Sequence, residues 1–149
     1  MFKERIVCQA RTWIGTKFHH QGRLKSNPKN KGGCDCIGLL IGTLKELDYD
    51  FNLRFQGFCD EKNYQRIVQD DILLKNIEKF FKKKNLSKIS SGDIALFSFS
   101  EKLPPQHIGI IGEHQGNLTL IHAYLKIGYV VEHFLDDYWK KYLFGVYEI

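Results

Sequence analysis

The sequence predicts an α+β domain in which N-terminal helices pack on a mainly antiparallel sheet of five to six strands. Runs with helical apolar spacing fill the first half of the 149-residue chain, and short β-rich runs separated by turn residues follow from Ile94 onward. Helices and strands segregated in this way are typical of an antiparallel sheet covered by helices. The length fits a single domain over residues 1–149 with a core of its own.

Two helices are predicted from apolar spacing alone. Residues 2–14 carry an apolar stripe and are expected to form a helix that ends before Gly15. Residues 61–84 carry a longer stripe that ends in Lys82-Lys83-Lys84, where cations suit the negative end of the helix dipole. We interpret this lysine run as a solvated helix end rather than as a binding patch.

A further helix is predicted from Cys36 to Leu47. The preceding residues 22–33 combine glycine, proline, asparagine and lysine, and we interpret them as a long exposed loop. Gly38 and Gly42 lie inside the helix, where each costs up to about 1 kcal/mol of helix propensity relative to alanine. Their presence indicates close packing against a neighbouring segment.

Cys36 is the candidate nucleophile. Asp35 directly precedes it and is a good N-cap residue, so Cys36 is expected in the first helical turn. The free backbone N–H groups and the positive dipole end there stabilise a thiolate, which is the reactive form of a cysteine nucleophile. The alternative is that Cys36 is a small buried apolar residue.

The β-rich half supplies the candidate base. Its predicted strands share β-branched and apolar residues, and they cover residues 94–99, 107–112, 118–124, 129–134 and 143–147. If a four-residue loop, 113–116, closes the second and third strands into a hairpin, Gly112 pairs with Asn117 and His107 lies opposite His122. Directly opposed side chains have Cβ atoms about 4.5–5.5 Å apart. One imidazole would then accept the thiol proton while the other fixes its tautomer.

Zinc binding is the competing chemistry for the same residues. Cys34 and Cys36 are ligand types, but the Cys-x-Cys spacing is shorter than usual and the chain has no second compact pair of ligands. We therefore expect neither a metal nor another cofactor.

The remaining histidines and cysteines have no site around them in the sequence. We interpret His114 and His133 as surface histidines, in a turn and on a strand. Cys8 lies off the apolar stripe of its helix and Cys59 lies in a connecting stretch, and free thiols are expected throughout.

Composition limits the classes of partner. The formal net charge of +5 favours an anionic partner, but the basic residues are not interleaved with aromatic residues on one element, which argues against nucleic acid. No stretch approaches the roughly 18 apolar residues of a membrane span. The stretch Met1–Trp13 lacks the apolar centre of a signal peptide, so synthesis in the cytoplasm without a signal peptide is expected.

The motifs around these residues resemble those of the NlpC-type cell-wall cysteine peptidases. Asp35-Cys36-Ile37-Gly38 matches the motif that opens the family's catalytic helix, although Ile37 stands where serine is usual. His107-Ile108-Gly109-Ile110 matches the strand that carries the base, and Ile121-His122-Ala123 resembles the strand that carries the third catalytic residue. Ser91-Gly92-Asp93-Ile94 resembles the turn before the first strand.

A narrower likeness points to the branch found in prophage tails and gene transfer agents. Its motifs are matched by Ala10-Arg11-Thr12-Trp13-Ile14-Gly15-Thr16, His20-Gln21 and Gly33-Cys34-Asp35-Cys36. The family usually has a tyrosine where Phe18 stands, and its hydroxyl is thought to lie in the active site. If the domain is active, His20 or Gln21 is the nearest candidate in sequence to replace that donor.

The resemblance implies a papain-like fold and a hydrolase of peptidoglycan stem peptides, at the bond between D-glutamate and the diamino acid. Cys36 would be the nucleophile, His107 the base and His122 its orienting partner, with the Cys36 backbone N–H in the oxyanion hole. The implied partners are phage-tail or gene-transfer-agent tail proteins, which would carry the domain to the cell wall. Two alternatives remain open: a catalytically weak structural component of a tail tip, and an acyltransferase on the same fold.

Overall fold

The computed structural model describes residues 2–47 and 71–149, and in these ranges helices and strands are segregated as predicted. The helices are α1 (Phe2–Arg11), α2 (Cys36–Leu47), α4 (Ile72–Phe80), α5 (Asp137–Tyr142) and the short 3-10 helix η1 (Leu86–Lys88). The strands are β1 (Arg23–Leu24), β2 (Gly33–Cys34), β3 (Lys82–Lys84), β4 (Ile94–Phe97), β5 (His107–His114), β6 (Asn117–Ala123), β7 (Val130–Phe134) and β8 (Leu143–Glu148).

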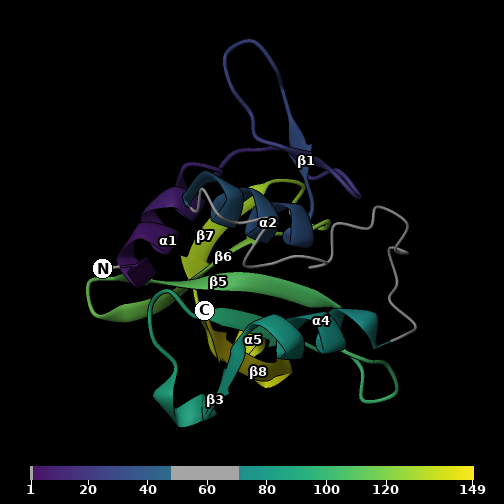
Figure 1. Ribbon diagram of the computed structural model, residues 1–149, viewed down its shortest axis with the longest axis vertical. Coiled ribbons are helices and arrows are strands. Elements are labelled where there is room, and N and C mark those ends of the chain that lie inside the picture. The colour runs from purple at the N-terminus through teal and green to yellow at the C-terminus, as the bar shows by residue number, and fades with distance from the viewer. Residues whose placement is uncertain (1, 48–70) are drawn as a thin grey trace.

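Among the described residues, six strands form one sheet in the order β3-β8-β4-β5-β6-β7, and every neighbouring pair is antiparallel. Figure 1 shows α1 and α2 side by side on one side of this sheet, with β5 running below them. The predicted α+β architecture, with helices on a mainly antiparallel sheet, is confirmed.

Each face of the sheet packs a separate core. On the helix face, Ile94 and Leu96 of β4 join a cluster that includes buried side chains of α1, α2 and α4. The intervening Ala95 and Phe97 point to the opposite face, where they pack with Trp139 of α5. Both faces are therefore covered, because successive side chains of a strand point to opposite sides.

The two glycines of α2 mark close approaches, as predicted. A Cβ at Gly38 would overlap the carbonyl oxygen of Gly22, and a Cβ at Gly42 would overlap the ring of Trp13. Trp13 also donates from Nε1 to Glu46 Oε2 at 2.9 Å. The sequence between α1 and α2 is thus held directly against α2.

The predicted third helix needs correction at its C-terminal end. α4 ends at Phe80, and Lys82–Lys84 is not a helix end but the edge strand β3, paired with β8. Phe81 adopts an extended conformation and buries its ring, and Lys84 binds the fully buried carboxylate of Asp93. These tertiary contacts override the helical pattern. Residues 61–70 of the prediction, like Cys59, lie outside the described residues.

Smaller differences concern the segment before α2 and the element ends. The stretch 22–33, predicted as a loop, contains β1 and the first residue of β2, and these strands pair Arg23 with Cys34 and Leu24 with Gly33. α1 ends at Arg11, three residues before the predicted end, and β5 continues to His114. No helix in the described ranges is long and apolar enough to cross a membrane.

Candidate active site

Asp35 fixes the start of α2 and thereby the position of Cys36. Its Oδ1 accepts from the Gly38 backbone N–H at 2.8 Å, which is the bond expected of an N-cap residue. Its Oδ2 accepts from the Gln21 backbone N–H at 2.8 Å, and Arg23 Nη1 lies 3.1 Å from Oδ1. Asp35 therefore holds the helix start and the segment beside it in one arrangement, with Cys36 as the first residue of the helix.

The segment that carries Phe18, His20 and Gln21 runs beside the residues that lead into Cys36. The backbone of His19 donates to the Cys34 carbonyl at 3.0 Å. Phe18 is partly buried against the helix-face core, and Gln21 adopts a left-handed backbone conformation with φ of 61°. The structure thus brings Phe18 and Gln21 near the start of α2, while the role of His20 or Gln21 as an oxyanion donor stays a prediction.

The Cys36 sulfur lies at the boundary between α2 and the sheet. The backbone N–H groups of Ile108 and Ile37 favour its thiolate by hydrogen bonding, but burial, followed by the charge of Asp35, raises the pKa of the Cys36 thiol to about 12. This direction opposes the predicted stabilisation of a thiolate by the helix N-terminus, because burial of the sulfur favours the neutral thiol.

The predicted contact between the two histidines is present. His107 Nε2 and His122 Nδ1 are 2.8 Å apart, and both side chains are buried. Burial lowers the pKa of His107 to about 3. Burial, together with the neighbouring His107 and His133, lowers the pKa of His122 to about 2. Both imidazoles are therefore neutral at pH 7.

The register that creates this contact differs from the predicted one. Asn117 pairs with His114 rather than with Gly112, because the turn contains only Gln115 and Gly116. Both turn residues have positive φ, 50° and 78°, as a two-residue hairpin turn with the favoured twist requires. The register is shifted by two residues, which keeps every side chain on its predicted face.

The two histidines consequently meet diagonally rather than directly. Gly109 lies beside His122 in the structure: a Cβ at Gly109 would be 3.2 Å from the His122 Cβ. The absence of a side chain at Gly109 leaves room for this arrangement.

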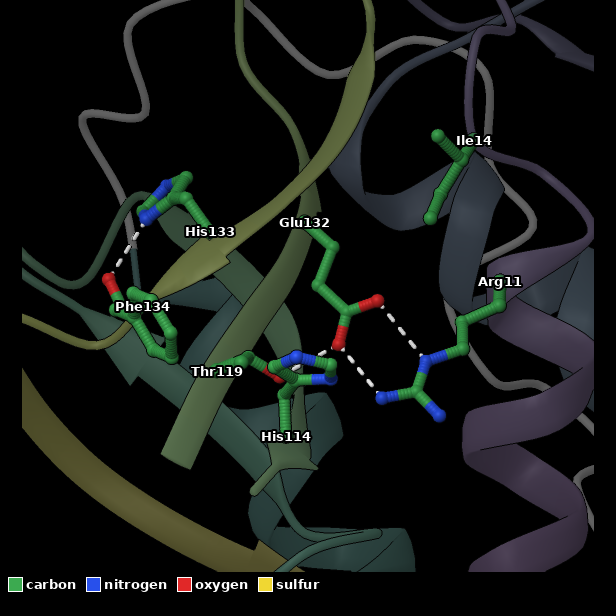
Figure 2. A pocket seen from close by; sticks show the side chains of 7 residues that line it. All are labelled: Arg11, Ile14, His114, Thr119, Glu132, His133 and Phe134. Carbon is green, nitrogen blue, oxygen red and sulfur yellow. Dashed lines mark hydrogen bonds and ion pairs between the residues drawn. The ribbon is translucent and has the colours of Figure 1, made fainter. Parts of the chain in front are cut away.

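His133, predicted as a surface histidine, is partly exposed on the edge strand β7, but it also continues the chain of imidazoles. Its Nε2 lies 2.8 Å from His122 Nε2, and its Nδ1 lies 2.8 Å from the carbonyl oxygen of Phe134. Figure 2 shows the His133 ring turned toward this carbonyl, whereas Glu132 points toward Arg11. The signal that sequence reasoning missed is the register of β6 with β7, which brings His133 to the face of His122.

Aromatic rings enclose the three imidazoles. The Trp139 ring centroid lies 4.7 Å from that of His122, 5.6 Å from that of His133 and 5.9 Å from that of His107. Tyr124 stacks on His122 at 5.7 Å with an interplanar angle of 19°. This packing limits the orientations that each ring can adopt.

Cys36 and His107 flank the same short stretch of backbone. The sulfur is beside the N–H of Ile108, the residue that follows His107. In the described ranges, no hydrogen bond joins the Cys36 sulfur to His107 itself.

A cavity of about 510 Å³ opens at the β7 edge of the sheet (Figure 2). Inside it, Arg11 donates to Glu132 through Nε at 2.9 Å and Nη2 at 2.8 Å, and Thr119 donates to Glu132 at 2.6 Å. Cys36 and His107 do not line this cavity, but His133 does. The cavity therefore lies at the far end of the imidazole chain from the thiol.

Metal ligation finds no support in the positions of these side chains. Within residues 2–47 and 71–149, no three His, Cys, Asp or Glu side chains converge as metal ligands. Cys8, Cys34 and Cys36 are free thiols.

The fold of the chain is similar to that of several solved structures. No protein-family model and no curated protein matches the sequence. Among solved structures, the chain is similar to the NlpC/p60 domain of the peptidoglycan hydrolase SagA, with a TM-score of 0.65 and 17% identity over 99% of this chain and 98% of that chain. It is also similar to an N-acetylmuramoyl-L-alanine amidase from Bacteroides uniformis, with a TM-score of 0.62 and 14% identity over 97% and 96%.

A third similar structure is Ly7917 with the hydrolyzing product of MDP, with a TM-score of 0.60 and 13% identity. The match covers 98% of this chain but 62% of Ly7917. The chain shares its fold with these structures, the first of which is an NlpC/p60 domain, and this agrees with the predicted papain-like architecture.

Proposed function

We propose that the protein is a cysteine peptidase of the NlpC/p60 type that hydrolyses amide bonds in peptidoglycan stem peptides. The observation that carries the proposal is the placement of Cys36 as the first residue of α2, with its sulfur beside the amide that follows the buried His107. The similar solved structures support the proposal, since their titles name peptidoglycan hydrolases and amidases.

The reaction would begin with a neutral Cys36 thiol and a neutral His107 imidazole. The Cys36 sulfur attacks the substrate carbonyl carbon while its proton passes to the His107 nitrogen, Nδ1, that does not face His122. The new C–S bond leaves negative charge on the carbonyl oxygen, to which the Cys36 backbone N–H donates. Collapse expels the amine, which takes the proton from His107. Water, deprotonated by His107, then hydrolyses the thioester and restores the thiol.

The finer assignment is the bond between D-glutamate and the diamino acid, cut by a domain carried to the cell wall on a phage-like tail. The matches at residues 10–16, 20–21 and 33–36 to the tail-associated branch support this setting. The net charge of +5 suits an anionic cell wall.

Digestion of purified sacculi tests the proposal directly. The wild-type protein is expected to release fragments with a new amino group on the diamino acid, identified by mass spectrometry. Cys36→Ala should release none, whereas Cys8→Ala, which changes an exposed cysteine on α1, should match the wild type. A folded wild-type protein that releases no fragments contradicts the proposal.

A second candidate function is a structural tail component with a weakened site. The raised pKa of Cys36 and the phenylalanine at position 18 favour it. Alkylation of Cys36 by iodoacetamide at several pH values separates the two: in an enzyme, a bound stem-peptide substrate analogue should protect Cys36 from labelling. Labelling that the analogue leaves unchanged, in a protein without hydrolase activity, would favour the structural role.

A further inference from the structure

We infer that His133 is a positioning residue that sets the tautomers of His122 and His107, so that His107 keeps an unprotonated Nδ1 available to Cys36. This inference rests on the proposed function for its chemical consequence, but the order of the hydrogen bonds follows from the structure. It begins at the end of the imidazole chain farthest from the thiol.

The carbonyl of Phe134 fixes the first ring. A carbonyl oxygen can only accept a hydrogen bond, so His133 Nδ1, 2.8 Å away, must carry a proton. In a neutral imidazole the other nitrogen is then an acceptor. His133 therefore presents a lone pair on Nε2 toward His122.

The same logic passes through the second ring to the third. His122 Nε2, 2.8 Å from that lone pair, must donate, which leaves His122 Nδ1 as an acceptor. His107 Nε2 lies 2.8 Å from His122 Nδ1 and must donate in turn. His107 Nδ1 is then the acceptor that a general base needs.

The opposite placement of the three protons leaves the contact between His133 and the Phe134 carbonyl without a hydrogen. If every proton shifted to the other nitrogen of its ring, His133 Nδ1 and the Phe134 oxygen would face each other with lone pairs at 2.8 Å. With three neutral rings, only one direction satisfies all three contacts. Because Trp139 packs against all three rings, the rings cannot easily turn to escape this constraint.

The surroundings of His133 allow its acceptor to be removed without disturbing the rest of the site. His133 lies on the edge strand β7 and is only partly buried. The charged side chains Arg11 and Glu132, which line the same cavity, are paired with each other. His114 lines the same cavity and its ring lies 6.4 Å from that of Phe134, but within the described residues it has no hydrogen bond to the imidazole chain, so it offers a matched control.

The test measures tautomers and turnover separately. Long-range ¹H–¹⁵N correlation spectra of ¹⁵N-histidine-labelled protein at pH 7.5 are expected to show the proton of His133 on Nδ1 and those of His122 and His107 on Nε2. His133→Phe should give His107 a population protonated on Nδ1 and lower kcat about tenfold, a part of the 10²–10⁴-fold that general-base catalysis typically contributes. KM should stay unchanged.

Rescue and control variants complete the experiment. His133→Gln offers an acceptor oxygen to His122 Nε2 and should restore both the tautomers and most of kcat, whereas His114→Phe should change neither. Unaltered His122 and His107 tautomers in His133→Phe, or a His133 proton on Nε2 in the wild type, overturn the inference. The expected tautomers in a protein that releases no fragments from sacculi would instead overturn the proposed function and leave the hydrogen-bond order standing.

Discussion

The two faces of the sheet are both buried, but they are packed with different kinds of side chain. The face under α1, α2 and α4 is filled mainly by aliphatic residues such as Ile110 and Ile121. The face under α5 carries the imidazoles among aromatic rings, including Phe97 and Trp139. Aliphatic packing is non-directional, whereas the imidazole chain depends on the orientation of each ring.

The difference indicates that the two faces have different roles, one in stability and one in turnover. We expect substitutions on the helix face to act on the free energy of unfolding, and substitutions on the imidazole face to act on turnover. Cys36, at the start of α2, and His107, on the imidazole face, both lie at the start of β5.

The largest effect is expected from Cys36→Ala. It removes the proposed nucleophile and should lower hydrolysis by more than about 10³-fold. The free energy of unfolding should change much less than turnover does, because the substitution removes a single sulfur atom. Rates of fragment release and urea denaturation measure the two effects. Measurable turnover in Cys36→Ala would place the chemistry elsewhere.

Two adjacent residues of β6 compare the faces directly. Ile121→Ala empties a fully buried site on the helix face and should cost about 2–5 kcal/mol of unfolding free energy, while turnover per folded molecule is retained. His122→Gln should lose less stability but slow kcat by about 10–100-fold, because the amide accepts from His107 with less electrostatic support. A larger loss of kcat in Ile121→Ala than in His122→Gln would contradict this difference between the two faces.

Acid should destabilise the imidazole face selectively. The pKa values of His107 and His122 are lowered to about 3 and about 2, below the ordinary value of 6.5 that applies after unfolding. Their contribution is therefore complete above pH 6.5 and is lost as the pH falls toward 3, at about 1.4 kcal/mol per pH unit for each histidine.

Urea denaturation between pH 7 and pH 5 isolates this contribution from the buried carboxylates, which titrate at lower pH. The His122→Gln variant should show a shallower slope than the wild type. Equal slopes would mean that His122 is not buried as a neutral ring.

The smallest effect is expected at Phe18. Phe18→Tyr adds a hydroxyl to a partly buried ring beside the segment that leads to Cys36, with little change in volume. Turnover should stay the same or rise less than tenfold if His20 or Gln21 already supplies the oxyanion donor. In that case, one of His20→Ala and Gln21→Ala should lose at least tenfold in kcat, within the loss of about 10²–10³ that removal of such a donor can cause. A several-hundredfold gain in kcat in Phe18→Tyr, with both alanine variants at the wild-type rate, would contradict the idea that His20 or Gln21 replaces the missing hydroxyl.

The parts of the site that local sequence predicts are those whose geometry is local. Asp35 as N-cap, Cys36 as the first residue of α2 and the close approach at Gly38 all depend on residues a few positions apart or on a glycine's missing side chain. The contact between His107 and His122 was also predictable, because one hairpin creates it.

The parts that local sequence did not predict depend on pairing between distant segments. His133 joins the imidazoles through the register of β6 with β7, and Lys82–Lys84 becomes a strand because β8 is available to pair with it. The pKa of Cys36 likewise depends on burial by the whole fold. None of these can be inferred from helical spacing or from the chemistry of one side chain.

The two-residue turn at Gln115 and Gly116 has a consequence for comparing this chain with distant relatives. The face that a strand residue occupies depends on whether its offset from its partner is even or odd, and not on the size of the offset. A relative whose register in this hairpin differs by two would keep both imidazoles on the aromatic face, where a shift in one direction would oppose them directly and a shift in the other would move them apart. A register that differs by one would place one of them among the aliphatic side chains. In a relative, an even difference in the pairing of β5 with β6 is therefore compatible with this arrangement of faces, whereas an odd difference is not.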